Sequence, residues 1–179
     1  MRFNLAFALA LSLAAAGGAD AAPRAPYGLG RPASAAQIAG WDIDVRADGA
    51  GLPPGRGSVG DGRAIYAVSC SGCHGQNGEG GYADALVGGK GTLATVKPVR
   101  TVGSYWPYAT TLFDYVRRAM PYNAPQSLTD DQTYAVVAYV LFLNQIVPAG
   151  AVLDAKTLPG VRMPNRNGFT SPDPRPDAR

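Results

Sequence analysis

The sequence predicts an all-α domain with long irregular extensions at both ends. Three segments between residues 60 and 147 show the caps or the apolar spacing of helices. Residues 22–59 are rich in glycine, proline and alanine, and residues 148–179 contain six prolines; both compositions favour irregular structure. The last ten residues, TSPDPRPDAR, are expected to be disordered. The stretch CSGCH, from Cys70 to His74, directly follows the first predicted helix.

Residues 1–21 have the features of a secretory signal peptide: one early basic residue, an apolar run and the cleavage sequence Ala19-Asp20-Ala21. The apolar run from Leu5 to Ala16 is too short to cross a bilayer, and no later stretch is long enough, so we expect no membrane span. The mature protein is therefore expected to be exported and to begin near Ala22.

The charge balance excludes little and indicates no polyanionic partner. The chain has 16 basic and 13 acidic side chains, a formal net charge of +3. Removing residues 1–21 takes away Arg2 and Asp20, so the mature chain keeps +3 (15 minus 12). Such a small excess does not indicate nucleic-acid or membrane binding.

Residues 22–59 are expected to form an extension without helix or strand. The segment from Trp41 to Val45 is different because it alternates and contains a large aromatic residue, which predicts a strand-like piece packed on this domain or on a partner. Burial of Trp41 within the same chain is the favoured interpretation.

The first helix is predicted over Gly62–Ser69, with Asp61 as its N-cap. Its apolar side is expected to consist of Ala64, Ile65 and Val68. The following segment, Gly75–Gly91, is too rich in glycine for regular structure and is predicted to be a loop whose backbone can approach a flat ligand closely.

The second helix is predicted from about Thr110 to Ala119, ending at Met120-Pro121 because proline cannot continue it. Its expected buried stripe is Leu112, Tyr115, Val116 and Ala119. The third helix opens at Thr129, where Gln132 completes a capping box, and Pro148 follows its end. Its expected buried stripe is Tyr134, Val137, Ala138 and Leu141.

The CSGCH stretch predicts a c-type haem attachment site. Two cysteines at i and i+3 lie on one side of a helical turn, so both thiols can bond to one edge of a haem. Cys70 and Cys73 would form the thioethers, and His74 would be the proximal iron ligand. Three helices around this motif predict a class I cytochrome c fold over residues 60–147 with one covalently bound haem c.

Other interpretations of CSGCH fit less well. A thioredoxin-like site needs a βαβ setting, and the flanking residues show no strand pattern. A structural zinc site needs four protein ligands, whereas the chain has two cysteines and one histidine. A disulfide between Cys70 and Cys73 is possible but leaves His74 without a role.

The sixth iron ligand decides between an electron carrier and a catalyst. His74 is the only histidine, so a second histidine ligand is excluded. Met120 and Met163 remain as thioether ligands because Met1 leaves with the signal peptide. Met120 is favoured because it directly precedes the loop to the third helix, whereas Met163 lies in the proline-rich extension.

Several other side chains could assist the haem. Tyr105 and Trp106 are candidate donors to the propionates, although core packing explains them equally well. Arg100, Arg117 and Arg118 could donate to propionates too, and the last two could form either a basic docking rim or a solvated helix face. No catalytic triad, paired carboxylates or phosphate loop is found, and isolated Glu79 is expected to face solvent, so no enzyme activity of its own is expected.

Three runs of the sequence resemble the cytochrome c subunits of sulfite dehydrogenases and of the Sox sulfur dehydrogenase. They are WDIDVRADGAGLPPGRGSVGDGRAIY, TVGSYWPYATTLFDYVRRAMPYNAPQSLTDDQTYAVVAYVLFLNQIV and LPGVRMPNRNGF. The resemblance covers roughly residues 41–170. It implies Cys70 and Cys73 as attachment sites, with His74 and Met120 as axial ligands.

The resemblance also implies a function. In that family a molybdopterin subunit oxidises a sulfur compound and passes electrons singly to the haem subunit, which passes them to a downstream cytochrome or oxidase. The expected location is the periplasm, where haem is attached to such proteins. The Sox version resembles a longer protein with two haem regions, so the single motif favours the sulfite dehydrogenase type or a stand-alone carrier.

Two other functions remain open from the sequence. One is a free diffusible cytochrome without a stable molybdenum partner, and the other is a haem enzyme or sensor whose iron lacks the methionine ligand. The resemblance further suggests that the segments 41–58 and 148–169 help to bind the molybdenum subunit.

Overall fold

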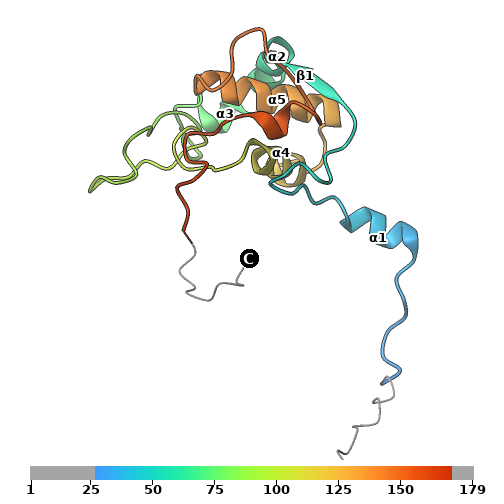
Figure 1. Ribbon diagram of the computed structural model, residues 1–179. Helices are drawn as coiled ribbons and strands as arrows, with labels where there is room; N and C mark the ends of the chain where they lie inside the picture. The colour runs from blue at the N-terminus through green and yellow to red at the C-terminus, as the bar shows by residue number, and fades with distance from the viewer. Residues whose placement is uncertain (1–26, 171–179) are drawn as a thin grey trace, which may run out of the picture. The chain divides into compact units, whose positions relative to one another are not determined.

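The computed structural model describes residues 27–170, so the predicted signal peptide and the expected disorder at the C-terminal end lie outside the described residues. The chain divides into one unit up to Ile38 and a compact unit formed by Ala39–Arg179. The helices and strands in chain order are α1 (Ala35–Trp41), β1 (Arg56–Ser58), α2 (Val59–Ser69), α3 (Ser71–His74), α4 (Ala109–Ala119), α5 (Asp130–Leu143), β2 (Val152–Asp154) and the 3₁₀ turn η1 (Leu158–Gly160). The mainly helical fold is confirmed (Figure 1).

Helix α5 lies at the centre of the compact unit (Figure 1). Its predicted capping box is present: the Thr129 hydroxyl accepts a hydrogen bond from the Gln132 amide, and the Gln132 side chain accepts one from the Thr129 amide. All nine residues from Thr133 to Leu141 are buried, so α5 is covered on every side and not only along the predicted stripe. A helix covered all round is the usual core of a small helical domain.

Helix α2 crosses α5 at a contact between small residues. A Cβ atom added to Gly62 would lie 1.9 Å from the carbonyl oxygen of Ala135, so only glycine fits there. Gly57 in β1 also lies against Ala135. A Cβ atom added to Gly57 would lie 2.1 Å from the Ala135 nitrogen. One turn beyond Gly62, the Tyr66 ring contacts the Tyr139 ring with centroids 5.3 Å apart.

The predicted start and buried side of the first helix are both wrong. The N-cap is Ser58, whose hydroxyl accepts a hydrogen bond from the Asp61 amide, and Asp61 lies in the first turn. The buried positions of α2 are Val59, Gly62 and Tyr66, whereas Val68 is 88% exposed. Helix α2 faces α5 with Gly62 because the two backbones approach too closely there for an apolar side chain to fit between them.

Helix α4 matches its prediction to within one residue and ends before Met120. Leu112 and Val116 are buried as expected, and Phe113 is completely buried against Tyr134 with ring centroids 4.4 Å apart. Tyr115, also expected in the stripe, is 46% exposed. The segment from Gly75 to Gly91 contains no helix or strand, as predicted.

The prediction of no helix or strand in residues 22–59 is wrong in two places. Residues 35–41 form α1, which Ser34 and Gln37 cap by reciprocal hydrogen bonds, and residues 56–58 form β1. Trp41 is 86% exposed, so its predicted burial within this chain is also wrong, and Val45 is the buried residue of that segment. The segment after Trp41 does not form a strand.

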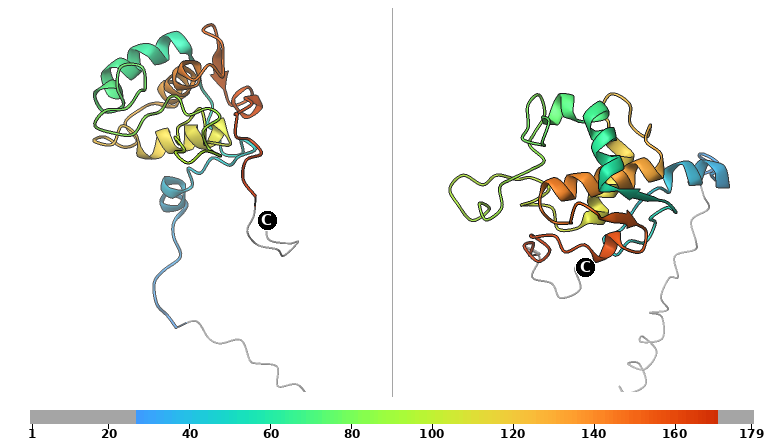
Figure 2. Two further views of the ribbon diagram at one scale, coloured as in Figure 1. Left: turned by 90° about the vertical axis from the view of Figure 1, so that its left-hand side faces the viewer. Right: turned by 90° about the horizontal axis from the view of Figure 1, so that it is seen from above.

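The C-terminal segment contributes to the core. Strand β2 pairs antiparallel with β1, with Gly57 opposite Leu153 (Figure 2). Leu153, Leu158 and Met163 are 4%, 0% and 3% exposed and belong to the same apolar cluster as α4 and α5. The proline content therefore predicted neither β2 and the 3₁₀ turn η1 nor the burial of this segment.

The Gly62 contact gives a matched test. Substitution G62A places a methyl group onto the Ala135 carbonyl and should lower the free energy of unfolding by about 3 kcal/mol, at the upper end of overpacking costs. In the same helix, a Cβ added to Gly60 would lie 3.7 Å from the Ser58 hydroxyl oxygen, in ordinary contact. G60A should leave the stability unchanged or raise it by up to about 1 kcal/mol. Equal denaturant midpoints for the two variants would contradict the proposed contact.

The C-terminal segment gives a second test. L158A removes a completely buried side chain and should destabilise the domain by about 2–5 kcal/mol. V152A, at a position 50% exposed on the adjoining strand, should change the stability by less than about 1 kcal/mol. Thermal melts of both haem-loaded variants check this, and a Leu158 variant as stable as the unmodified protein would show that the segment is not part of the core.

Candidate functional site

The CSGCH stretch forms a single helical turn. Cys70 ends α2, and its carbonyl oxygen accepts hydrogen bonds from the Cys73 and His74 amides at 3.1 and 3.0 Å. The two sulfurs therefore belong to one side of the turn, as the spacing predicted. Neither cysteine is in a disulfide; Cys70 is half-buried and Cys73 is exposed.

The environment of Cys70 disfavours thiolate chemistry. Burial raises the pKa of the Cys70 thiol to about 11, and the neighbouring Cys73 adds to the shift. Such a thiol stays protonated at neutral pH, unlike the reactive cysteine of a redox site. Among residues 27–170, no three histidine, cysteine or acidic side chains form a group that could hold a metal ion.

The ring of His74 is oriented by a backbone carbonyl. Its Nδ1 atom lies 2.8 Å from the carbonyl oxygen of Asp84. Because a carbonyl oxygen only accepts, Nδ1 carries the proton, and Nε2 of the neutral ring keeps a free lone pair. This is the arrangement that metal-binding histidines use to fix their tautomer and direction.

The turn is supported by residues that the sequence analysis did not identify. The Tyr66 hydroxyl donates to the Gly75 carbonyl at 2.9 Å, and the Ser71 hydroxyl donates to the Ala67 carbonyl at 2.8 Å. The Tyr66 ring is 1% exposed, and burial is the main cause that raises the pKa of its hydroxyl to about 12. The sequence did contain one signal for Tyr66. It lies four residues after Gly62, so both residues lie on the side of α2 that faces α5.

Glu79 is exposed, as expected, and stabilises the loop that follows His74. Its carboxylate accepts a hydrogen bond from the Asn77 amide at 2.6 Å, and hydrogen bonds from backbone amides hold its pKa below the ordinary value. The Gly80 amide donates to the His74 carbonyl at 2.8 Å, which closes the loop on the turn.

The two candidate methionines lie in different surroundings. Met120 follows the last turn of α4, is partly buried, and donates its amide to the Val116 carbonyl. Met163 is 3% exposed within the apolar cluster.

The candidate propionate donors have aromatic partners. Tyr105 is 37% exposed and contacts Phe169 edge-on at 5.1 Å between centroids, and the Arg100 guanidinium lies 5.6 Å from its ring. Trp106 is partly buried and contacts Tyr115 edge-on at 5.6 Å. Neither aromatic side chain is part of the completely buried core.

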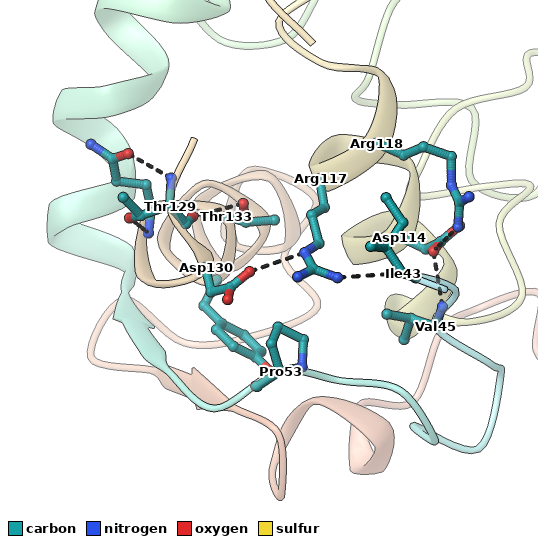
Figure 3. Close-up of polar contacts among 11 residues, drawn as sticks. Ile43, Val45, Pro53, Asp114, Arg117, Arg118, Thr129, Asp130 and Thr133 are labelled. Carbon is teal, nitrogen blue, oxygen red and sulfur yellow. Dashed lines mark hydrogen bonds and ion pairs between the residues drawn. The ribbon is translucent and has the colours of Figure 1, made fainter. Parts of the chain in front are cut away.

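The two arginines before Met120 are engaged within the chain. Figure 3 shows Arg117 directed at Asp130, with 3.0 Å between Nε and Oδ1. Arg118 contacts two carboxylates, Asp114 at 2.6 Å and Asp44 at 2.7 Å. Asp114 also accepts the Val45 amide, so these contacts fix the N-terminal segment on α4. Both arginines are therefore paired with carboxylates of this chain, and the Arg118 side chain stays 38% exposed.

Together these residues fit a covalently attached haem. Two free thiols on one turn can add to the vinyl groups of one edge, and the adjacent imidazole presents a lone pair for the iron. One imidazole of fixed direction, together with a methionine thioether from another part of the chain as the second iron ligand, is a donor set suited to one-electron transfer.

Two comparisons with known proteins agree with this assignment. Residues 57–140 match the family model described as cytochrome c oxidase, cbb3-type, subunit III. The chain is also similar to a chain in the crystal structure of the sulfane dehydrogenase SoxCD from Paracoccus pantotrophus, with 44% sequence identity and a TM-score of 0.77. That match covers 84% of this chain and 74% of the other.

The matches confirm the class I cytochrome c fold and, with it, haem c as the cofactor. They also confirm the resemblance inferred from the three sequence runs. By its identity and coverage, the chain belongs to the family of cytochrome c subunits of sulfur dehydrogenases.

Proposed function

We propose that this protein is the periplasmic monohaem subunit that takes electrons from a molybdopterin-containing sulfite or sulfur dehydrogenase and passes them to a downstream cytochrome or oxidase. The observation that carries the proposal is the oriented CSGCH turn in a chain 44% identical to a chain of SoxCD. The predicted signal peptide supports the periplasmic location.

When bound, the haem supplies a site for one electron at a time, and this chain's residues hold and tune it. Cys70 and Cys73 would hold one edge by covalent bonds. His74 is kept in direction by the Asp84 carbonyl, which would also make the imidazole a better electron donor. Tyr66 and Ser71 hold the backbone of the turn by hydrogen bonds, which would keep the attachment residues in place when the haem is bound.

Met120 is proposed as the sixth ligand. Support comes from its place after the last turn of α4 and from its partial exposure, which leaves the thioether free to bind. Met163 is 3% exposed and packs in the apolar cluster, so core packing already accounts for its side chain. A histidine–methionine pair leaves no open position for a substrate, which is the property of a carrier.

Tyr105 and Trp106 are proposed as donors to the haem propionates. The Arg100 guanidinium, 5.6 Å from the Tyr105 ring, supports this, because a propionate needs both a donor and nearby positive charge.

Within residues 27–170, no helix is long and apolar enough to cross a membrane.

The ligand assignment can be tested with two methionine variants. M120L should convert a six-coordinate haem into one that binds carbon monoxide stoichiometrically in the ferrous state, and should lower its reduction potential because the thioether is lost. M163L keeps core volume and should leave the haem spectrum unchanged, at a stability cost below about 1.5 kcal/mol. Carbon monoxide binding by the unmodified protein would instead favour a haem enzyme or sensor.

The partner assignment can be tested by isolating the tagged protein from its native host. Co-eluting molybdenum in a fixed ratio to haem is expected, together with reduction of the haem by sulfite or a sulfane sulfur compound. The substrate that reduces the haem identifies the dehydrogenase. A low-spin haem protein that elutes without molybdenum and is not reduced by either substrate would favour a free diffusible carrier.

A further inference from the structure

One loop of the haem domain carries several basic residues and no acidic one. From residue 85 to residue 113 the sequence has three basic residues, Lys90, Lys97 and Arg100, and no acidic one. All three are exposed. Among residues 27–170 the ion pairs involve only Arg117 and Arg118, so the charges of the loop are not neutralised by described neighbours.

The loop, residues 88–100, is held at its base by buried hydroxyl groups. The Thr101 hydroxyl donates to the Gly88 carbonyl at 2.6 Å, and the Ser104 hydroxyl donates to the Val99 carbonyl at 2.6 Å. Thr101 and Ser104 are 2% and 5% exposed, so the base is anchored in the domain. A Cβ atom on Gly89 would lie 2.2 Å from the Val99 carbonyl oxygen, which shows how closely the two ends approach.

Within the loop, Thr92 joins the two arms. Its hydroxyl donates to the Gly89 carbonyl at 2.7 Å and accepts a hydrogen bond from the Val99 amide at 2.9 Å. Thr95 continues the pattern by donating to the Thr92 carbonyl. A loop whose ends meet and whose interior is hydrogen-bonded presents its tip in a defined shape, as functional surface loops often do.

The loop leaves the domain on the side that carries α3, the helix of the haem-attachment turn (Figures 1 and 2). Its base follows closely after Asp84, the residue that orients His74. Its tip carries Val96, which is 99% exposed, between the two lysines. The surface therefore combines basic charge with a small apolar contact, next to the part of the domain that exchanges electrons.

We propose that the loop 88–100 is the docking element for an acidic redox protein that accepts the electron from the haem. This inference rests on the proposed electron-transfer function. Charge complementarity selects an acidic surface, and the small apolar area favours a transient electron-transfer partner over a permanently bound subunit.

The test uses the full-length haem-loaded protein and oxidised plastocyanin with an acidic surface patch as the probe. One electron leaves the ferrous haem and reduces Cu(II) to Cu(I), with no proton or bond transferred, and stopped-flow absorbance follows both centres. In the variant K90Q/K97Q the second-order rate constant at low salt should fall by about ten-fold, since electrostatic steering typically contributes at least that factor. Its salt dependence should also become flatter.

The matched control removes two exposed basic residues elsewhere, Lys156 and Arg162, from the C-terminal segment. The variant K156Q/R162Q has the same net charge as the loop variant and should lose less than about three-fold in rate. Both variants should keep the unmodified haem spectrum and melting temperature, because all four side chains are exposed.

Equal rate losses in the two variants, or none in the loop variant, would overturn the docking inference while leaving electron transfer intact. A failure of the proposed function is recognised separately. In that case the ferrous haem of the unmodified protein would react slowly with plastocyanin and also with ferricyanide, a small oxidant that needs no docking surface.

Discussion

The close approach of α2 to α5 at Gly62 and Ala135 is the constraint on which the haem site depends. The absence of a side chain at Gly62 lets two helix backbones touch, and this contact fixes where α2 lies along α5. Because Cys70 ends α2 and His74 follows one turn later, the same contact fixes the attachment turn. Tyr66 connects the two features: its ring lies against Tyr139 of α5, and its hydroxyl holds the Gly75 carbonyl.

The parts of the fold that could be predicted are those with local signals. The capping box at Thr129, the end of α4 before Met120-Pro121 and the CSGCH turn each involve neighbours within a few residues. The start and the buried side of α2 could not be predicted in the same way. Its contact with α5 uses a glycine, which leaves no mark in a pattern of apolar side chains. The pairing of β1 with β2 joins segments distant in sequence, for which three-residue strands give no signal.

The arginines show why charge alone does not identify a binding surface. Arg117 and Arg118 stand together before a proposed ligand, and the sequence cannot tell whether their charges are free. Their partners include Asp44, which lies far away in the chain and is brought to α4 by folding. By contrast, Lys90 and Lys97 lie in a stretch without acidic residues, and this depletion was already visible in the sequence.

The two sides of the proposed iron site are supported by different parts of the chain. The histidine side is built from residues 66–84, held by the α2–α5 contact and the Asp84 carbonyl. The methionine side depends on α4, which the N-terminal segment holds near both ends: the Thr110 hydroxyl donates to the Ala47 carbonyl, and Arg118 contacts Asp44. Residues 44–47 are therefore part of the scaffold that positions Met120. The basic loop attaches through Thr101 and Ser104, before α4 begins, so the surface proposed for docking belongs to neither of these two supports.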